Sequence, residues 1–235
     1  MQISLRFGLL FLIGILQCIS LQAQIRESDY YDTRPDSIDI LHYTIDLNLL
    51  EDNQNKILAS TLIRFRTKTN QISRIVLDLK GYTIDSVKFR QSHVSYQRQG
   101  EKIRIQFPEP LNNDQLDSVQ LWYGGSPFVN IQDFGRFYIS PGFSYNIGVS
   151  FLEDPHNFGR AWFPCFDNFT ERSTFTCRIS TRPDLLGYAG GVLVQDTLLA
   201  DRRVRTWEMN QEIPTYLASA ASAAFSELKD KYLSS

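Results

Sequence analysis

Hydrophobic and polar residues alternate along two neighbouring stretches in the first third of the chain. In the segment 40–49 the apolar positions on one face are Leu41, Tyr43, Ile45, Leu47 and Leu49. In the segment 57–68 the corresponding inward positions are Ile57, Ala59, Thr61, Ile63 and Phe65. Because successive side chains of a strand point to opposite faces, this period of two predicts two half-buried strands. The polar run 51–55 between them is typical of a turn, so we expect the strands to pair in antiparallel orientation.

Further segments with strand character follow, separated by turn residues at intervals of about ten residues. They are predicted at 73–79, 83–90, 93–97, 102–107, 118–123, 175–181, 188–194 and 203–209, with a loop at 108–113 and an irregular region at 128–159. No alternation of strands with helices appears in the sequence. The pattern predicts an all-β fold, an antiparallel β-sandwich or an open barrel-like sheet.

The first residues have the order of a secretory signal peptide. A positive charge precedes the apolar run 7–16, and the small residue Ala23 ends the segment. The apolar run is short for a membrane span, and a lipoprotein signal is disfavoured because Gln17 stands before Cys18. We therefore expect a signal peptide at 1–23 and an exported protein that is periplasmic, secreted or at the cell surface. An N-terminal membrane anchor is the alternative.

The rest of the chain is expected to form one domain. We predict a polar lead-in at 24–37, a β domain at 38–225 and a polar tail at 226–235, with no membrane span after removal of the signal. The formal net charge is -2 and the basic residues form no cluster. Nucleic acid is therefore not expected as a partner, because its binding needs clustered positive charge.

Only two cysteines remain after the signal peptide, Cys165 and Cys177. They could form one disulfide in an exported protein. We expect two buried thiols instead, because Cys177 shares a strand face with Phe175 and Ile179 and a free cysteine behaves as a small hydrophobic residue.

The segment 159–174 is dense in aromatic residues and predicts a buried loop that holds sheets together. It resembles the Arg-x-x-Phe-Pro-Cys-Phe-Asp-Glu-Pro signature of the zinc aminopeptidases of the aminopeptidase N type, a signature of their N-terminal β domain. The residues that carry the resemblance are Arg160, Trp162, Phe163, Pro164, Cys165, Phe166 and Asp167. The sequence departs from the signature at Asn168 and Phe169, where Glu-Pro is usual. The resemblance implies a saddle-like all-β domain.

Weaker similarities to the same family lie on both sides of the signature. The segment 41–47 resembles the first strand of the family's domain, and the segment 123–125 resembles the end of a later strand. The segment 213–225 is ambiguous by pattern, because Pro214 suits a turn into a strand whereas the alanine-rich run 218–224 suits a helix. The resemblance favours a strand, the last one of the domain.

The resemblance implies a full-length enzyme that removes N-terminal residues from peptides with a zinc ion. The family holds its zinc with H-E-x-x-H and a later Glu, because two His four residues apart share one helix face. The histidines of this chain are His42, His93 and His156, and none are paired at that spacing. The family's G-x-M-E-N segment is also absent. We expect no catalytic residue and no cofactor in this chain, which would be inactive alone. Its expected partner is the catalytic domain, and the substrate of the full-length enzyme would be a peptide.

One family function could lie within this chain. The resemblance implies an acidic or amide side chain shortly before the signature that binds the α-amino group of the substrate, and Glu153 or Asp154 could serve. An acidic surface loop is the alternative. A thiolate at Cys165 with His156 as base is disfavoured by the hydrophobic surroundings of the cysteine.

Two other readings of these segments are weaker. A metal site of His156 with the two acids is disfavoured by crowding of the ligands. The aromatic pairs 30–31 and 137–138 could stack on a ligand but are more often core or interface.

A different class of function is also open. The chain could be a stand-alone, non-catalytic β module that binds a peptide or protein through the surface that a catalytic domain would otherwise cover. Such a module should expose an apolar patch there. A truncated product without activity is the third possibility.

Overall fold

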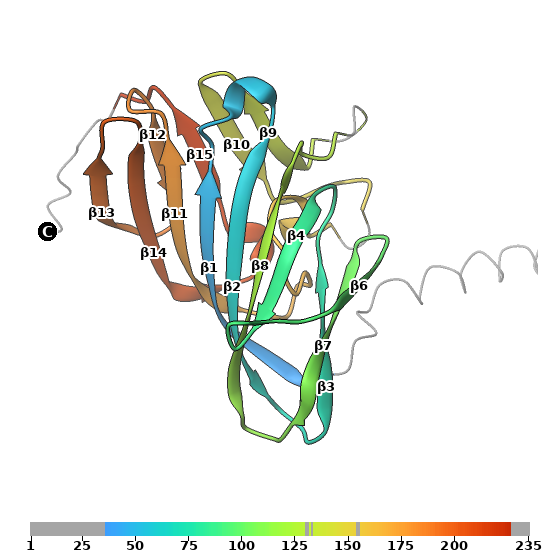
Figure 1. The fold of residues 1–235 in the computed structure, drawn as a ribbon. Helices are drawn as coiled ribbons and strands as arrows, with labels where there is room; N and C mark the ends of the chain where they lie inside the picture. The colour runs from blue at the N-terminus through green and yellow to red at the C-terminus, as the bar shows by residue number, and fades with distance from the viewer. Residues whose placement is uncertain (1–35, 130–131, 133, 154–155, 227–235) are drawn as a thin grey trace, which may run out of the picture. The chain divides into compact units, whose positions relative to one another are not determined.

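The computed structural model describes residues 36–129, 132, 134–153 and 156–226. The predicted signal peptide, the aromatic pair 30–31, Asp154 and the tail from residue 227 lie outside the described residues. Within them the fold is built of strands, as predicted, with three short 3₁₀ turns (Figure 1). The strands are β1 (Ile38–Asn48), β2 (Ile57–Thr67), β3 (Ile72–Asp78), β4 (Thr83–Phe89), β5 (Ser92–His93), β6 (Tyr96–Gln99), β7 (Lys102–Leu111), β8 (Leu116–Gly125), β9 (Arg136–Ser140), β10 (Phe143–Ile147), β11 (Ser173–Thr181), β12 (Leu186–Ala189), β13 (Val192–Leu198), β14 (Arg203–Ile213) and β15 (Ala220–Ala223).

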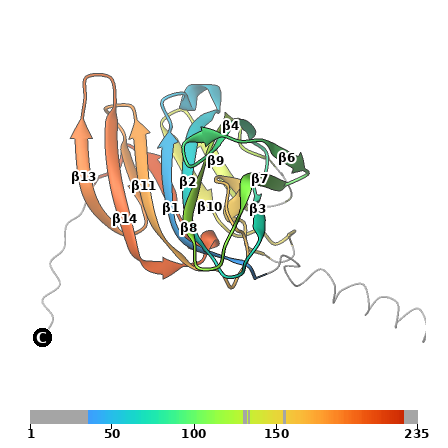
Figure 2. The same cartoon turned by 60° about the horizontal axis from the view of Figure 1, so that its bottom comes forward.

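The largest sheet contains eight strands in the order β13-β14-β11-β1-β2-β8-β4-β5, and Figures 1 and 2 show those from β13 to β4 side by side. Its centre is the predicted antiparallel pair of β1 and β2, in which Tyr43 lies opposite Ile63. The inward positions predicted for β2 are all buried. The prediction for β1 is wrong at Leu41, which is only half-buried, because a register shift between Ile40 and His42 brings Ile40 to the buried face.

One pairing in this sheet departs from the antiparallel expectation. Strand β11, which follows the signature segment, lies parallel to β1, with Ile45 opposite Cys177. Two parallel neighbours need a long connection in the sequence. The long connection here includes most of the domain, so the signature segment returns the chain to the centre of the sheet.

Two smaller sheets complete the domain, one with the order β12-β15-β10-β9 and one with the order β3-β7-β6. A single cluster of buried side chains joins them to one face of the large sheet. Members of this cluster from the three sheets include Tyr43, Ile45, Ile75, Leu77, Ile103, Phe137 and Ala220, and Trp162 of the signature segment joins them. The core therefore lies between the large sheet and the two smaller ones, and the other face of the large sheet is left outside it.

The structure corrects several predicted boundaries. The irregular region 128–159 contains the hairpin of β9 and β10. The segment 93–97 is divided between β5 and β6, and β7 continues into the expected loop 108–113. The segment 188–194 is broken at Gly191, whose φ of +101° favours glycine and where a Cβ would collide with the carbonyl oxygen of Glu208. The predicted last strand is present as β15, after a 3₁₀ turn at Thr215–Leu217.

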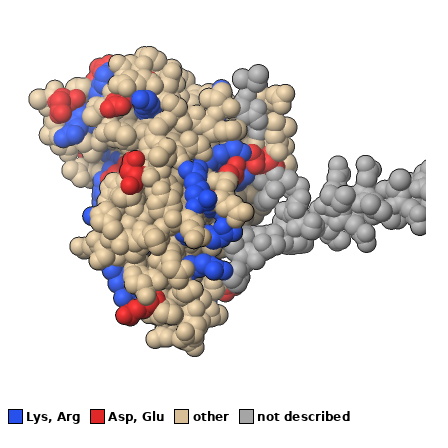
Figure 3. Space-filling view, turned by 45° about the vertical axis from the view of Figure 1, so that its right-hand side comes forward, with Lys and Arg blue, Asp and Glu red and all other residues tan. Residues whose placement is uncertain are grey.

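The surface carries no large block of one charge on the side shown in Figure 3, where uncharged residues cover most of the area. Basic and acidic side chains appear there in small separate groups. In the part of the chain that the structure describes, no helix has the length and hydrophobicity that a membrane crossing requires.

Candidate functional site

Residues 161–167 of the signature segment 159–174 are all buried and form the longest unbroken run of buried residues in the described part of the chain. It is fixed to the end of β3 by two main-chain hydrogen bonds. The amide of Asp78 donates to the carbonyl of Cys165 at 2.7 Å, and the amide of Cys165 donates back at 3.0 Å. The segment is thus held as an extra, one-residue extension of the three-stranded sheet.

Aromatic side chains of the large sheet hold the same segment from the other side. The hydroxyl of Tyr43 accepts a hydrogen bond from the amide of Phe166 at 2.9 Å, and its ring stacks on Phe175 with centroids 5.2 Å apart. The hydroxyl of Tyr123 donates to the carbonyl of Trp162 at 3.1 Å. Complete burial raises the pKa of Tyr43 and of Tyr123 well above the usual value, so both phenols stay neutral and act as hydrogen-bonding groups.

Asp167 closes the segment with a carboxylate that has no exposed side-chain surface. It accepts hydrogen bonds from the guanidinium of Arg160 at 2.8 Å and from the hydroxyl of Thr215 at 2.6 Å. The main-chain amide of Arg160 also lies 3.2 Å from the carboxylate. A buried carboxylate needs such partners to stay ionised, so Asp167 ties the start of the signature to its end and to the 3₁₀ turn before β15.

Arg160 is the centre of a larger group of charges. Its guanidinium pairs with Glu101 at 2.8 Å and with Glu153 at 2.9 Å, and it donates to the carbonyl of Asn157 at 2.6 Å. Burial lowers the pKa of Arg160, but the carboxylates of Asp167 and Glu101 outweigh this effect and raise it overall. The guanidinium is therefore permanently charged at every pH at which the protein is folded.

A second cation bridges the same two glutamates. The ammonium of Lys80 lies 2.8 Å from Glu101 and 2.5 Å from Glu153, and its main-chain amide donates to the carbonyl of Arg160 at 2.8 Å. Both cations also lie over the ring of Phe158, at 5.1 Å for Lys80 and 4.8 Å for Arg160. We call Lys80, Glu101, Glu153, Arg160 and Asp167 the ion-pair cluster.

Comparison with known proteins places this signature in a family. A sequence model of the peptidase M1 N-terminal domain matches residues 28–217. The chain belongs to the peptidase M1 N-terminal domain family. A search of curated proteins gave no match.

Solved M1 zinc metallopeptidases share the fold of this M1 N-terminal domain. One is a variant of a two-domain M1 zinc metallopeptidase bound to L-tryptophan, with a TM-score of 0.70 and 21% identity, covering 80% of this chain and 43% of that chain. Another is the M1 zinc metallopeptidase from Deinococcus radiodurans, with a TM-score of 0.69 and 22% identity over 80% of this chain and 42% of that chain. At this identity the likeness shows the fold alone. The chain spans less than half the length of these proteins.

The structure brings together the signature and one of the two predicted substrate-binding acids of this M1 N-terminal domain. Both carboxylate oxygens of Glu153 are engaged, one with Lys80 and one with Arg160. Asp154 lies outside the described residues. The carboxylate of Glu153 is therefore held in place by two cations.

The other sequence candidates lie apart from one another. Cys165 and Cys177 are both buried thiols that form no disulfide, as predicted. His156 is exposed and bonds through its ring to the carbonyl of Glu153. Phe137 is buried in the core, so it offers no surface for stacking.

Among the described residues, no three His, Cys, Asp or Glu side chains are grouped so that they could bind a metal ion such as the family's zinc. Two of the histidines lie on different strands, His42 on β1 and His93 on β5, and His156 lies in the loop before the signature. The residues present in the described part do not fit the metal site that the resemblance implies for the full-length enzyme.

Sequence reasoning missed Lys80 and Glu101, which complete the ion-pair cluster. They stand 80 and 59 positions before Arg160 in the sequence. They reach Arg160 only because the ends of β3 and β7, which they adjoin, pack against the signature segment.

 Neither residue stands in a motif, so no local pattern marks it. An arginine within a segment predicted to be buried requires acidic partners, and this requirement is the one signal that could have prompted a search for them.

Proposed function

We propose that this chain is the N-terminal domain of an exported zinc metalloaminopeptidase, and that a catalytic domain docks on the outer face of its four-stranded sheet. The observation that carries the proposal is the apolar character of that face. Its aromatic members are Tyr138, Phe143, Tyr145, Tyr188 and Phe225.

The outer face is a row of rings over small residues. Tyr138 and Tyr145 lie opposite each other on β9 and β10 and stack with centroids 4.6 Å apart. Ala221 of β15 lies between Tyr145 and Tyr188 in the register of the sheet. The side chains on the opposite face, such as Ser144, are buried against the rest of the domain. Arg136 covers Tyr138, with its guanidinium 4.2 Å from the ring centroid, and Arg205 and Trp207 pack on Tyr188 at 4.5 Å and 5.2 Å. The apolar surface left open to a partner is therefore centred on Phe143 and Phe225.

Exposed rings of this kind favour a protein interface. Phe143 is 49% exposed and Phe225 is 40% exposed, on strand β10 and just after β15. Large apolar patches on a domain mark interaction sites, because leaving them in water is unfavourable. A stand-alone module would show the same patch, so the identity of the partner is the point to be tested.

The comparisons favour a catalytic domain as that partner. The similar solved proteins are named zinc metallopeptidases, and this chain covers 43% of one of them. One of the Deinococcus radiodurans structures is bound to a Tyr-Ser-Ala substrate. By analogy, the whole protein would cleave N-terminal residues from peptides, and its zinc would be bound outside the described part of this chain.

The ion-pair cluster supports a role for Glu153 next to the substrate amine. Two cations, Lys80 and Arg160, face three carboxylates, Glu101, Glu153 and Asp167, so the cluster has one negative charge in excess. A net negative site complements an ammonium group. Glu153 would accept a hydrogen bond from the substrate's α-amino group, and Asp154 would stand beside it in the chain.

Export is part of the same proposal. The signal-like segment 1–23 supports it, with a periplasmic, secreted or cell-surface location for the mature protein.

The first test is the mass and activity of the native product. An antibody against residues 38–225 should detect an exported species at least twice the 27.1 kDa of this chain, and the purified species should release fluorophore from amino-acid coumarin amides. A chelator should abolish the activity and zinc should restore it. A species near 27.1 kDa that has neither activity nor a bound partner with an H-E-x-x-H motif would refute the enzyme and favour the stand-alone module.

The docking face has its own test with a matched control. Phe143→Glu places a charge on the outer face of the four-stranded sheet and should weaken association with the catalytic domain, measured by limited proteolysis between the domains. Leu116→Glu, at a residue 58% exposed on β8 of the large sheet, should leave the association unchanged. Equal effects of the two substitutions would place the interface elsewhere.

A further inference from the structure

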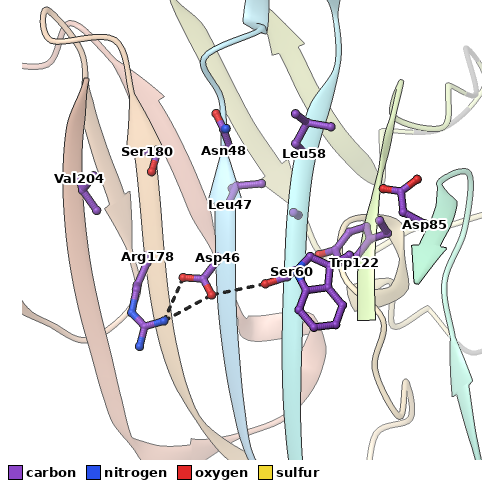
Figure 4. A pocket seen from close by; sticks show the side chains of 12 residues that line it. Asp46, Leu47, Asn48, Leu58, Ser60, Asp85, Trp122, Arg178, Ser180 and Val204 are labelled. Atoms are coloured by element: carbon purple, nitrogen blue, oxygen red, sulfur yellow. Dashed lines mark hydrogen bonds and ion pairs between the residues drawn. The ribbon is translucent and has the colours of Figure 1, made fainter. Parts of the chain in front are cut away.

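A groove crosses the face of the large sheet that points away from the core (Figure 4). Its volume is about 320 Å³, and strands β14, β11, β1, β2, β8 and β4 contribute to its lining. This volume is at the lower end of the range for small-molecule sites in proteins. The groove belongs neither to the signature segment nor to the outer face of the four-stranded sheet.

The strand register explains why the sheet is hollowed there. One row of facing residues consists of Arg178, Asp46, Ser60 and Trp122. The next row consists of Ser180, Asn48, Leu58 and Gly124. The short side chains of Ser60 and Ser180 leave room along the groove, whereas Leu58 fills the space over Gly124. Neighbouring strands are about 4.8 Å apart, so a groove across six of them is about 24 Å long.

The charges in the groove cancel. Asp46 accepts two contacts from one nitrogen of Arg178, at 3.0 Å and 3.3 Å, and the hydroxyl of Ser60 lies 3.4 Å from the same carboxylate. At the other end, Asp85 of β4 lines the groove, and the ammonium of Lys88 lies 5.2 Å from the ring centroid of Trp122. With Lys88 counted, two acidic and two basic side chains surround the groove. A groove of zero net charge gives no electrostatic preference to an anionic or cationic ligand.

Hydrogen-bonding groups of both kinds remain available. Within the described residues, the indole N–H of Trp122 and the side-chain amino group of Asn48 make no hydrogen bond, and the carboxylate of Asp85 makes none either. The indole is half-buried, with the ammonium of Lys88 5.2 Å from its ring centroid. An aromatic face beside fixed donors and acceptors suits a ligand that has both C–H surfaces and hydroxyl groups.

A peptide fits this groove less well. Most strands beneath it are paired with neighbours on both sides, and only β4, which pairs with β5 at Lys88 and Phe89 alone, has a short unpaired edge near Asp85. A peptide lying across the groove would therefore run over paired strands for most of its length. Recognition would depend on side chains alone, and the amide groups of a peptide would cross the groove without fixed partners.

We propose that this groove binds a short neutral oligosaccharide. A sugar ring packs its C–H face on Trp122, and its hydroxyls exchange hydrogen bonds with Asp46, Arg178 and Asn48. The ion pair orients both of its members, so little order is lost when the sugar binds. This function is separate from the peptidase role and does not depend on it.

The test is calorimetric titration of the full chain with neutral tetrasaccharides of glucose, mannose, galactose and N-acetylglucosamine. We expect one of them to bind at millimolar or lower dissociation constant, and Trp122→Ala to weaken it by at least about tenfold. The dissociation constant of Trp122→Phe should lie between those of the wild type and of Trp122→Ala. Asp46→Asn should also weaken binding. The matched control is Leu116→Ala, which removes an exposed apolar side chain of the same strand outside the groove.

The outcomes separate the ligands. Binding of a tetrasaccharide that is lost in Trp122→Ala and kept in Leu116→Ala supports the proposal. No binding of any of the four sugars by the folded wild-type chain overturns it, as does binding that Trp122→Ala and Trp122→Phe leave unchanged. An uncharged pentapeptide that binds in their place, with the same dependence on Trp122, also overturns it and assigns the groove to peptides.

Discussion

Replacement of Arg160 by methionine tests whether the ion-pair cluster holds the signature segment in place. The substitution keeps a long apolar stem and removes the guanidinium. It leaves Asp167 with no exposed side-chain surface and without the partner that lies 2.8 Å away. Glu101 and Glu153 lose the same cation but keep Lys80. The unpaired buried carboxylate of Asp167 therefore dominates the expected effect.

The magnitude follows from the remaining contacts. Removing one member of a buried ion pair costs about 3–5 kcal/mol, because the other charge is left without compensation. Asp167 would still accept hydrogen bonds from a main-chain amide and from Thr215, so we expect a loss near the lower end, about 3 kcal/mol. For a domain of this size, 1 kcal/mol shifts the melting temperature by about 2–4 °C. The expected shift is therefore about 6–12 °C.

The assay is urea unfolding followed by intrinsic fluorescence, with thermal melts as a second measurement. The control is Arg178→Met, which breaks an ion pair whose side chains are 48% and 43% exposed. Exposed pairs contribute about 0–1 kcal/mol, so the control should unfold close to the wild type. Arg160→Met combined with Asp167→Asn should cost less than the sum of the two single substitutions, because the second removes the charge that the first leaves unpaired.

Two results would refute this reasoning. A loss below about 1 kcal/mol for Arg160→Met would mean that the cluster contributes no more than an exposed pair. Strict additivity of the two substitutions would mean that Arg160 and Asp167 do not depend on each other.

Three further predictions concern single groups around the signature. Tyr43→Phe removes the hydroxyl that accepts from the amide of Phe166 and keeps the ring, so urea unfolding should show a loss of about 1–3 kcal/mol; unchanged stability would mean that the amide finds another partner. Cys165 and Cys177 should react with Ellman's reagent only after unfolding, because both are buried and burial raises the pKa of Cys177 to about 12; fast reaction of the folded chain would contradict this. Burial raises the pKa of Glu101, but its two cationic partners outweigh this and lower it below 4.5, so its stabilisation is present above that pH and lost as the pH falls through the folded-state pKa. Glu101→Gln should therefore reduce stability at neutral pH and flatten its decline in acid; an unchanged acid limb would assign that decline to other carboxylates.

The sequence predicted the residues of the signature but only part of their surroundings. The density of aromatic residues from Trp162 to Phe166 indicates burial by itself, and the structure buries all of them. Glu153 was found because it precedes the signature in the chain. Lys80 was not found, because its contact with Glu153 spans 73 positions and no local pattern records a partner at that distance.

The strands show the same division. Alternation located β1 and β2 because each has one buried face, which imposes a period of two. It failed at Leu41, where a register shift moves the buried positions by one residue. It also failed to find β9 and β10, since Tyr138 and Tyr145 put apolar rings on the outer face and so hide the alternation.

The sequence by itself determined the fold class, the family and the inward face of most central strands. Each of these depends on local periodicity or on a run of adjacent residues, which the order of residues contains directly. Only the tertiary structure decided that β11 lies parallel to β1, that Lys80 and Glu101 meet Arg160, and that Trp122 borders a groove. These features join residues far apart in the chain, and their positions depend on how whole sheets pack, so no short segment of sequence specifies them.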